Sequence, residues 1–138
     1  MNYLLDTCFL SELVKPLPNK HVIEWLKRHS SEFLFICSLT VGEIRKGVTK
    51  LPESKKKDDL NQWLNNLLDH YNDRILPIDT TVAENWGILQ GNAEKKGLGM
   101  ATIDGLIAAT AYTHNLTIVT RNEQDFQASG VPVLNLWV

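Results

Sequence analysis

The chain of 138 residues is 43% hydrophobic and 22% charged, which suits one globular domain and excludes a disordered or fibrous chain. No apolar run approaches the roughly 18 residues that suggest a membrane span. The net charge of −2 argues mildly against a nucleic-acid-binding protein, because phosphate binding usually requires an excess of Lys and Arg. That objection weakens if several acidic side chains bind cations, since the remaining surface would then be positive.

Two features of the chain indicate its cellular setting. Asp6 lies where a signal peptide would have a basic start followed by a longer apolar run. The two cysteines, Cys8 and Cys37, are too few for a disulfide framework and lack zinc-finger spacing. We therefore expect a cytoplasmic protein with reduced thiols and no membrane association.

Short apolar runs alternate with longer helical patterns along the chain, which predicts an α/β fold with a mostly parallel sheet. Strands are expected at residues 3–5, 33–36, 75–78, 116–119 and 131–134, the last at an edge because it contains Pro132. Helices are expected at 7–14, after a cap at Asn19, and at 40–48, 53–71, 80–96 and 102–114. Because the strands are continuously apolar, helices should cover both faces of the sheet. We predict one domain over residues 1–138, with four to five strands.

Four acidic side chains fall where a predicted strand ends or a predicted helix begins: Asp6, Glu43, Asp104 and Asp125. Each alone has a structural explanation, as a helix cap, a solvated carboxylate, a residue that complements a helix dipole and a turn residue, respectively. These explanations do not account for the coincidence of all four on one edge of the predicted sheet. That edge, at the carboxyl ends of the strands, is where parallel sheets bind ligands.

Carboxylates gathered in this way repel one another, and without a partner some would have raised pKa values. A hard divalent cation such as Mg²⁺, or Mn²⁺ in its place, prefers oxygen ligands and relieves the repulsion. Such an ion can activate a water molecule and stabilise the charge that develops during phosphodiester hydrolysis. The acidic cluster therefore predicts metal-dependent phosphodiester chemistry.

Five motifs along the chain surround these acids. They are Leu4–Thr7 followed by Ser11-Glu12, Ser38–Ile44, Arg74–Asp79, Asp104–Ala111, and Val119–Asn122 continuing through Asp125-Phe126. In this order the chain resembles the PIN-domain ribonucleases, specifically the VapC-type toxins of bacterial toxin–antitoxin pairs and their FitB-like subgroup. The resemblance covers essentially the whole chain. At the closing Leu134–Trp137, Leu136 replaces the proline of the family's usual Asn-Pro-Trp ending.

The resemblance implies that Asp6, Glu43 and Asp104 are the core metal ligands. Asp125 is our choice for the remaining carboxylate, and Asn122, where some relatives carry the acid, could bind through its amide oxygen. Thr7 and Thr120 are expected to hydrogen-bond metal-bound water molecules. Arg45, Lys46 and Lys50 are the candidates for contacts with RNA phosphates, because their helix begins beside the predicted site.

The activity implied by the resemblance is magnesium-dependent endoribonucleolytic cleavage of RNA, with tRNA as the expected substrate. The implied partners are a second copy of the chain, in a homodimer, and an antitoxin encoded by an adjacent gene. The antitoxin inhibits the toxin in a heteromeric complex by inserting a tail, commonly with an arginine, into the acidic groove.

Two alternatives remain open from the sequence. One is a PIN scaffold without catalytic activity that acts only by binding its partner. The other is a phospho-accepting receiver domain with Asp79 as acceptor, but that class requires an acidic pair after the first strand and a lysine after the last, and both are missing here. We interpret Asp79 instead as a helix cap.

Overall fold

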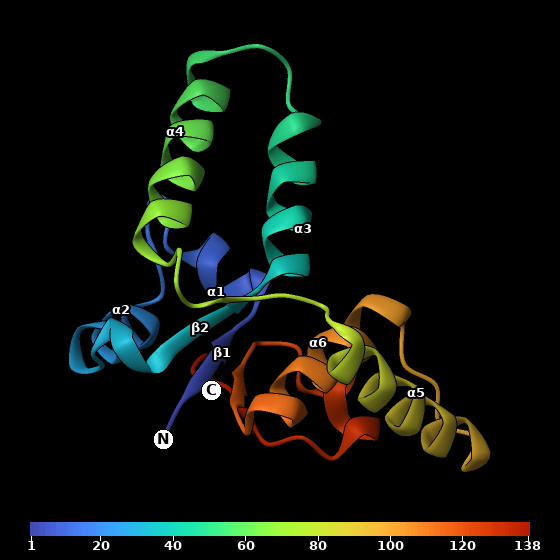
Figure 1. Cartoon of the computed structure of the whole chain (residues 1–138). Helices are drawn as coiled ribbons and strands as arrows, with labels where there is room; N and C mark the ends of the chain where they lie inside the picture. The colour runs from blue at the N-terminus through green and yellow to red at the C-terminus, as the bar shows by residue number, and fades with distance from the viewer.

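Five strands form the centre of the structure, a computed structural model that describes residues 1–138 (Figure 1). The strands are β1 (Tyr3–Leu5), β2 (Leu34–Cys37), β3 (Ile75–Leu76), β4 (Thr117–Val119) and β5 (Val133–Leu134). Their order in the sheet is β3-β2-β1-β4-β5, and every neighbouring pair is parallel. The predicted parallel sheet is confirmed, with the strand after Pro132 at an edge. Because β1 is central, the first residues of the chain pair with both β2 and β4.

Six α-helices and two short 3₁₀ helices connect the strands. The α-helices are α1 (Thr7–Glu12), α2 (Lys20–Arg28), α3 (Ser38–Thr49), α4 (Lys55–His70), α5 (Thr80–Lys95) and α6 (Thr102–His114), and the 3₁₀ helices are η1 (Ser31–Phe33) and η2 (Glu123–Ser129). Two predicted caps are confirmed: Asn19 Oδ1 accepts from the backbone N–H of His21 at 2.8 Å, and Asp79 Oδ1 accepts from that of Val82 at 3.0 Å. None of the helices combines the length and hydrophobicity of a membrane-spanning helix.

Several element boundaries differ from the prediction by one or two residues, among them the following three. α1 ends at Glu12 instead of residue 14, because the N–H groups of Leu13 and Val14 bond three residues back in a tighter turn. α3 begins at Ser38 instead of residue 40, directly after β2. β3 has only two residues, and Pro77, which follows them, has no N–H to extend the strand.

Helices pack on both faces of the sheet, as predicted. Because side chains alternate along a strand, Leu5, Ile36 and Val119 belong to a core cluster with residues of α1, α2, α3 and α4. Leu4 and Ile118 face the other way, into a second cluster with Ile107 and Ala108 of α6 and Phe126 of η2. Two separate cores therefore pack against the two faces of β1. They fix the position of Asp6, the residue that follows this strand.

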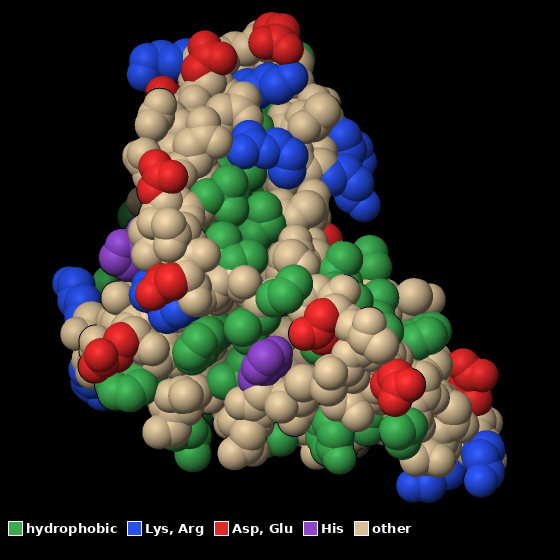
Figure 2. All heavy atoms as spheres, in the orientation of Figure 1, with side chains coloured by type: hydrophobic (Ala, Val, Ile, Leu, Met, Phe, Trp, Pro, Cys, Tyr) green, Lys and Arg blue, Asp and Glu red, His purple; other side chains and the backbone are tan.

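α3 and α4 form a hairpin that projects away from the sheet (Figure 1). Arg45 of α3 joins the two helices, because its guanidinium donates to Asn61 Oδ1 at 2.8 Å and to Asn65 Oδ1 at 3.0 Å, both on α4. Figure 2 shows hydrophobic side chains between the two helices, with Lys and Arg side chains over the hairpin.

α5 and α6 pack against each other around a glycine. Gly105, in the first turn of α6, is buried, and a Cβ at this position would lie 2.8 Å from Gln90 Oε1 and 2.9 Å from Trp86 Nε1 of α5. Gln90 Nε2 also donates to the carbonyl oxygen of Met100 at 3.2 Å, just before α6 begins. The start of α6, which carries Asp104, is thus held closely against α5.

Candidate active site

The site lies where β1, β2 and β4 end. Asp6 follows β1 directly, and its backbone N–H donates to Val119 O, the last carbonyl of β4, at 3.1 Å. Thr120 follows β4, and Glu43 lies in the second turn of the helix that follows β2. The parallel sheet therefore brings these three segments to one edge, as the sequence predicts.

Asp6 is a buried carboxylate, with 7% of its surface exposed. Thr120 Oγ1 donates to Asp6 Oδ2 at 2.8 Å, and Cys8 Sγ lies 3.8 Å from the same oxygen. The helix-cap explanation of Asp6 is wrong, because its side chain makes no capping hydrogen bond to α1. Burial raises the pKa of Asp6 above its ordinary value, against hydrogen bonds from Thr7 N and Thr120 that lower it, and the charge of Glu43 raises it further.

Glu43 is half-buried and is oriented by α1. Thr7 Oγ1, at the start of α1, donates to Glu43 Oε1 at 2.9 Å, across 36 residues of sequence. Thr7 and Thr120 thus play parallel parts, because each donates its hydroxyl proton to one of the two carboxylates. The second oxygen of Glu43, Oε2, has no hydrogen-bond partner and is available for another ligand.

Asp104 connects the remaining acids to this pair. Its pKa is raised to about 6, first by partial burial and then by the negative charges of Asp125, Asp6 and Glu43, in that order. The negative charges of the other three predicted acids therefore all act on Asp104, which is half-buried in the first turn of α6. Asp125 itself is exposed, in the first turn of η2.

Asn122 lies at the entrance to η2, with an exposed side chain. Its backbone N–H donates to Thr120 Oγ1 at 3.0 Å, and its carbonyl oxygen accepts from the N–H of Asp125 at 3.1 Å. The Asn122 backbone therefore links the hydroxyl that orients Asp6 to the residue that carries the fourth acid.

The donor set fits a hard divalent cation. No three His, Cys, Asp or Glu side chains lie close enough together to hold an ion by themselves. Mg²⁺ commonly binds through one or two carboxylates and retains several water molecules, so it does not require a closed protein cage. Burial raises the pKa values of Asp6 and Asp104, and neighbouring carboxylates raise them further, so a bound cation would relieve this repulsion.

The three basic residues predicted to contact RNA differ in their exposure and in their contacts. Lys46 on α3 and Lys50, which follows its last residue, are exposed and form no ion pair. Arg45 is half-buried and held by the two α4 asparagines described above. Because those partners are neutral, the charge of Arg45 is not compensated by a carboxylate.

A small groove begins at the site and runs along the α3–α4 hairpin. It has a volume of about 260 Å³. Its polar end contains Thr7 and Glu43, and the rest is mostly apolar, with Ser11, Val14, Ile44, Gly47, Val48, Leu51, Leu60 and Trp63. An elongated ligand in this groove would have apolar contacts along its length and a carboxylate at one end.

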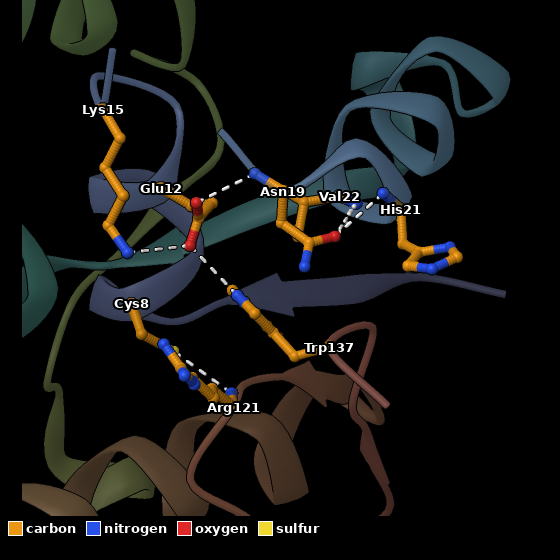
Figure 3. A network of polar contacts seen from close by, with 8 residues as sticks. All are labelled: Cys8, Glu12, Lys15, Asn19, His21, Val22, Arg121 and Trp137. Atoms are coloured by element: carbon orange, nitrogen blue, oxygen red, sulfur yellow. Dashed lines mark hydrogen bonds and ion pairs between the residues drawn. The ribbon is translucent and has the colours of Figure 1, made fainter. Parts of the chain in front are cut away.

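Two residues at the site were not identified from the sequence alone. Cys8, on α1, has its thiol within 3.4 Å of Thr120 Oγ1, and Cys8 Sγ accepts from the backbone N–H of Arg121 at 3.2 Å (Figure 3). Both cysteines are free, as expected, and burial raises the pKa of the Cys8 thiol. Cys8 therefore acts as a neutral packing and hydrogen-bonding group that ties α1 to the segment after β4.

The second is Glu12, a buried acid that belongs to no metal site. Its carboxylate accepts from Asn19 N at 2.9 Å, Trp137 Nε1 at 3.0 Å and Lys15 Nζ at 3.1 Å (Figure 3). These donors, Trp137 first, lower its pKa to about 2. The only signal in the sequence is that Ser11-Glu12 and Trp137 both belong to the quoted motifs, which does not show that they touch.

Replacing Trp137 by phenylalanine should lower the free energy of unfolding by about 1–2 kcal/mol at neutral pH, through loss of a hydrogen bond to a charged acceptor. Because the folded-state pKa of Glu12 lies below its ordinary value of 4.5, its contribution is present above that pH and disappears as the pH falls through about 2. Urea unfolding of both proteins measures this effect. The difference between their free energies of unfolding should be smaller near pH 3 than at neutral pH. Trp63→Phe is the control, since its smaller effect should not depend on pH.

Comparisons with known proteins identify the family. The PIN-domain family model matches residues 3–130. Toxin FitB of Neisseria gonorrhoeae is 40% identical over 135 residues, covering 97% of this chain and 97% of the relative. The VapC ribonuclease Y4jK of Sinorhizobium fredii is 32% identical over 135 residues, covering 97% of this chain and 96% of the relative. The chain belongs to the PIN-domain family, and the receiver-domain alternative is wrong.

Solved structures agree with this assignment. The crystal structure of FitAcB from Neisseria gonorrhoeae contains a chain that superposes with a TM-score of 0.93 at 40% identity, covering 98% of both chains. A chain in the structure of VapBC2 from Rickettsia felis, bound to a DNA fragment from their promoter, superposes with a TM-score of 0.76 at 27% identity, covering 98% of both chains. The predicted PIN fold is therefore confirmed along the whole chain.

Proposed function

We propose that this protein is a metal-dependent endoribonuclease and the toxin of a toxin–antitoxin pair. The observation that carries the proposal is the geometry at the carboxyl edge of the sheet, where Thr120 Oγ1 donates to Asp6 at 2.8 Å and Thr7 Oγ1 donates to Glu43 at 2.9 Å. The relative Y4jK is named a VapC ribonuclease, and FitB is named a toxin. The sequence motifs, the fold and the acid cluster support one activity.

In the proposed mechanism Asp6, Glu43, Asp104 and Asp125 would hold Mg²⁺, or Mn²⁺ in its place, with the amide oxygen of Asn122 as a further candidate ligand. A bound divalent ion supplies a water nucleophile of lowered pKa and neutralises charge on the phosphoryl oxygens. Thr7 and Thr120 orient Glu43 and Asp6 by donating to one oxygen of each carboxylate. These two threonines are positioning residues, and in addition they could contact metal-bound water as the sequence predicts.

The substrate we propose is RNA, with tRNA as the expected member of that class. Lys46 and Lys50 on the exposed face of α3 would contact phosphates beside the cleavage site. The uncompensated charge of Arg45 would add to their field. Together these cations offset the acidity of the site, which otherwise repels a polyanion.

The partner we propose is an antitoxin that occupies the groove between α1 and the α3–α4 hairpin. Apolar antitoxin side chains would cover Val14, Leu51 and Trp63, and an arginine would reach Glu43 at the polar end of the groove. Such an inhibitor would exclude RNA from the same carboxylates that bind the metal. The VapBC2 complex is a toxin–antitoxin structure by its family name and includes promoter DNA.

We also propose that the protein forms a homodimer and acts in the cytoplasm. Ile88 of α5 and Tyr112 of α6 expose 60% and 58% of their surface. Large apolar side chains so exposed on neighbouring helices favour an interface between two copies. The free thiols agree with a reducing compartment.

The test is cleavage of total cellular RNA by the purified chain and by an Asp6→Ala variant, each with Mg²⁺ or with EDTA. We expect cleavage only by the unmodified protein with metal, and sequencing of the new ends would identify the substrate. Circular dichroism of the variant must show that it is folded. If neither protein cuts RNA, even with Mn²⁺ and without residual antitoxin, a PIN scaffold that only binds its partner becomes the better description.

A further inference from the structure

Arg121 is a cation beside the acidic site whose side chain has no protein partner. It follows Thr120, whose hydroxyl donates to Asp6, and it is exposed. None of the ion pairs in the structure involves Arg121. This is notable because Glu123 and Asp125 line the same pocket as Arg121. A guanidinium near carboxylates that it does not contact is available to an external anion.

The backbone of Arg121, in contrast, is held from both sides. Its N–H donates to Cys8 Sγ at 3.2 Å, from a residue 113 positions away, and its carbonyl oxygen accepts from Asn135 Nδ2 at 3.5 Å. Figure 3 shows the Cys8 contact, in which α1 meets the segment after β4. Two side chains from distant segments thus fix the backbone of an exposed residue. The point from which the side chain extends is therefore defined, and its guanidinium is free of protein contacts.

The pocket around Arg121 is suited to a nucleotide backbone. It has a volume of about 300 Å³, and none of its six lining residues is hydrophobic. Asn122, Gln124 and Asn135 contribute amide groups, and the backbone N–H of Asn122 donates at 3.0 Å to Thr120 Oγ1, the hydroxyl that orients Asp6. The lining has one cation, Arg121, beside the carboxylates of Glu123 and Asp125, so a phosphodiester would bind there at the guanidinium, and the absence of apolar lining disfavours an apolar ligand.

From these observations we infer that Arg121 binds a backbone phosphate of the RNA substrate next to the one that is cleaved. The inference rests on the proposed ribonuclease function and adds a substrate-binding residue to it. The guanidinium forms two parallel hydrogen bonds to phosphate oxygens, which sets the register of the strand over the metal site. The acids repel the RNA backbone, so a cation at their border favours the approach of the strand at that point.

Steady-state cleavage of a short single-stranded RNA tests this inference. Arg121→Ala should raise KM about tenfold and leave kcat within about twofold, because a contact outside the reacting phosphate strengthens binding of substrate and transition state equally. The KM of Arg121→Lys should lie between those of the unmodified protein and Arg121→Ala, since lysine keeps the charge but cannot form two parallel hydrogen bonds to one phosphate. The matched control is Arg28→Ala, another exposed arginine without an ion pair, on α2 at the amino-terminal end of β1. The KM and kcat of Arg28→Ala should equal those of the unmodified protein.

Direct binding provides a second readout that does not need cleavage. Fluorescence anisotropy of a labelled RNA in Mg²⁺, with Asp6→Asn as the uncut background, should show about tenfold weaker binding when Arg121→Ala is added. The slope of log affinity against log salt should fall by about 0.7, the value for one phosphate contact on a single strand. Unchanged KM, affinity and salt slope, in a protein that does cut RNA, would overturn the inference. Loss of cutting by the unmodified protein would instead reject the proposed function.

Discussion

Replacing Asp104 by asparagine should reduce RNA cleavage about a hundredfold or more and, at the same time, stabilise the metal-free protein at neutral pH. The loss of activity follows from removing a proposed metal ligand, since even groups that only support ligands typically contribute about 10- to 100-fold. The gain in stability follows from removing a charge that partial burial and three other carboxylates disfavour. Opposite effects on activity and stability distinguish a functional acid from a structural one.

The sign of the stability effect depends on pH. The pKa of Asp104 rises from an ordinary value of 3.8 to about 6 in the folded protein, so the folded state binds the proton more tightly than the unfolded state. Stability therefore falls as the pH rises through this window, and the full penalty is present above it. The Asn variant lacks the penalty. Its advantage should be largest at neutral pH and should disappear near the ordinary pKa.

Thermal unfolding in EDTA across this pH range measures the effect, and repetition with Mg²⁺ gives the internal comparison. Mg²⁺ should stabilise the unmodified protein more than the variant, because the variant has lost a ligand. Asp69→Asn, an exposed acid on α4 that forms no ion pair, should change neither curve. A variant that is less stable than the original in EDTA at neutral pH would mean that the acids are not mutually repulsive.

Gly105→Ala should destabilise the protein by about 1–2 kcal/mol and reduce cleavage with it. An alanine Cβ would lie 2.8 Å from Gln90 Oε1, 2.9 Å from Trp86 Nε1 and 3.1 Å from Trp86 Cδ1. Overpacking of this kind costs about 1–3 kcal/mol, against a gain of up to about 1 kcal/mol from the higher helix propensity of alanine. The cost of the clash should exceed the gain in helix propensity, because the Trp86 ring could move away only if α5 separated from α6.

Gly91→Ala is the matched control, because Gly91 lies on α5 of the same helix pair and has nothing within 4 Å of its Cβ position. It should raise stability by up to about 1 kcal/mol. Chemical denaturation measures both variants, and cleavage assays below the unfolding transition report whether Asp104 has moved. Equal stabilisation by the two alanines would show that the contact between α5 and Gly105 is loose.

Much of the fold was predictable because its signals are local. The apolar runs before Asp6 and Thr120 are recognisable as buried strands, and the parallel arrangement follows from their alternation with helices. The same reasoning places Asp6, Glu43 and Asp104 at one edge, because only the order of strands and helices is needed. The two caps at Asn19 and Asp79 are equally local, since each side chain reaches only its own helix.

The remaining features depend on contacts between distant residues. Glu12 and Trp137 are 125 residues apart, and Thr7 and Glu43 are 36 apart, so no periodicity connects them. Arg45 was expected to contact RNA from its place in α3, but its hydrogen bonds to Asn61 and Asn65 depend on how α4 folds back. The choice between Asn122 and Asp125 as a ligand stays a prediction, because both are exposed on one short segment.

The long separation between Asp6 and Thr120 also has a temporal consequence during translation. The hydrogen bond between them spans 114 residues, which a ribosome adds in roughly 6–23 s at about 5–20 residues per second. Throughout that interval β1 lacks its neighbour β4, and the carboxylate of Asp6 has neither its threonine nor the acids of the second half of the chain. The proposed nuclease therefore cannot attack RNA near its own polysome before Thr120 has been added to the chain.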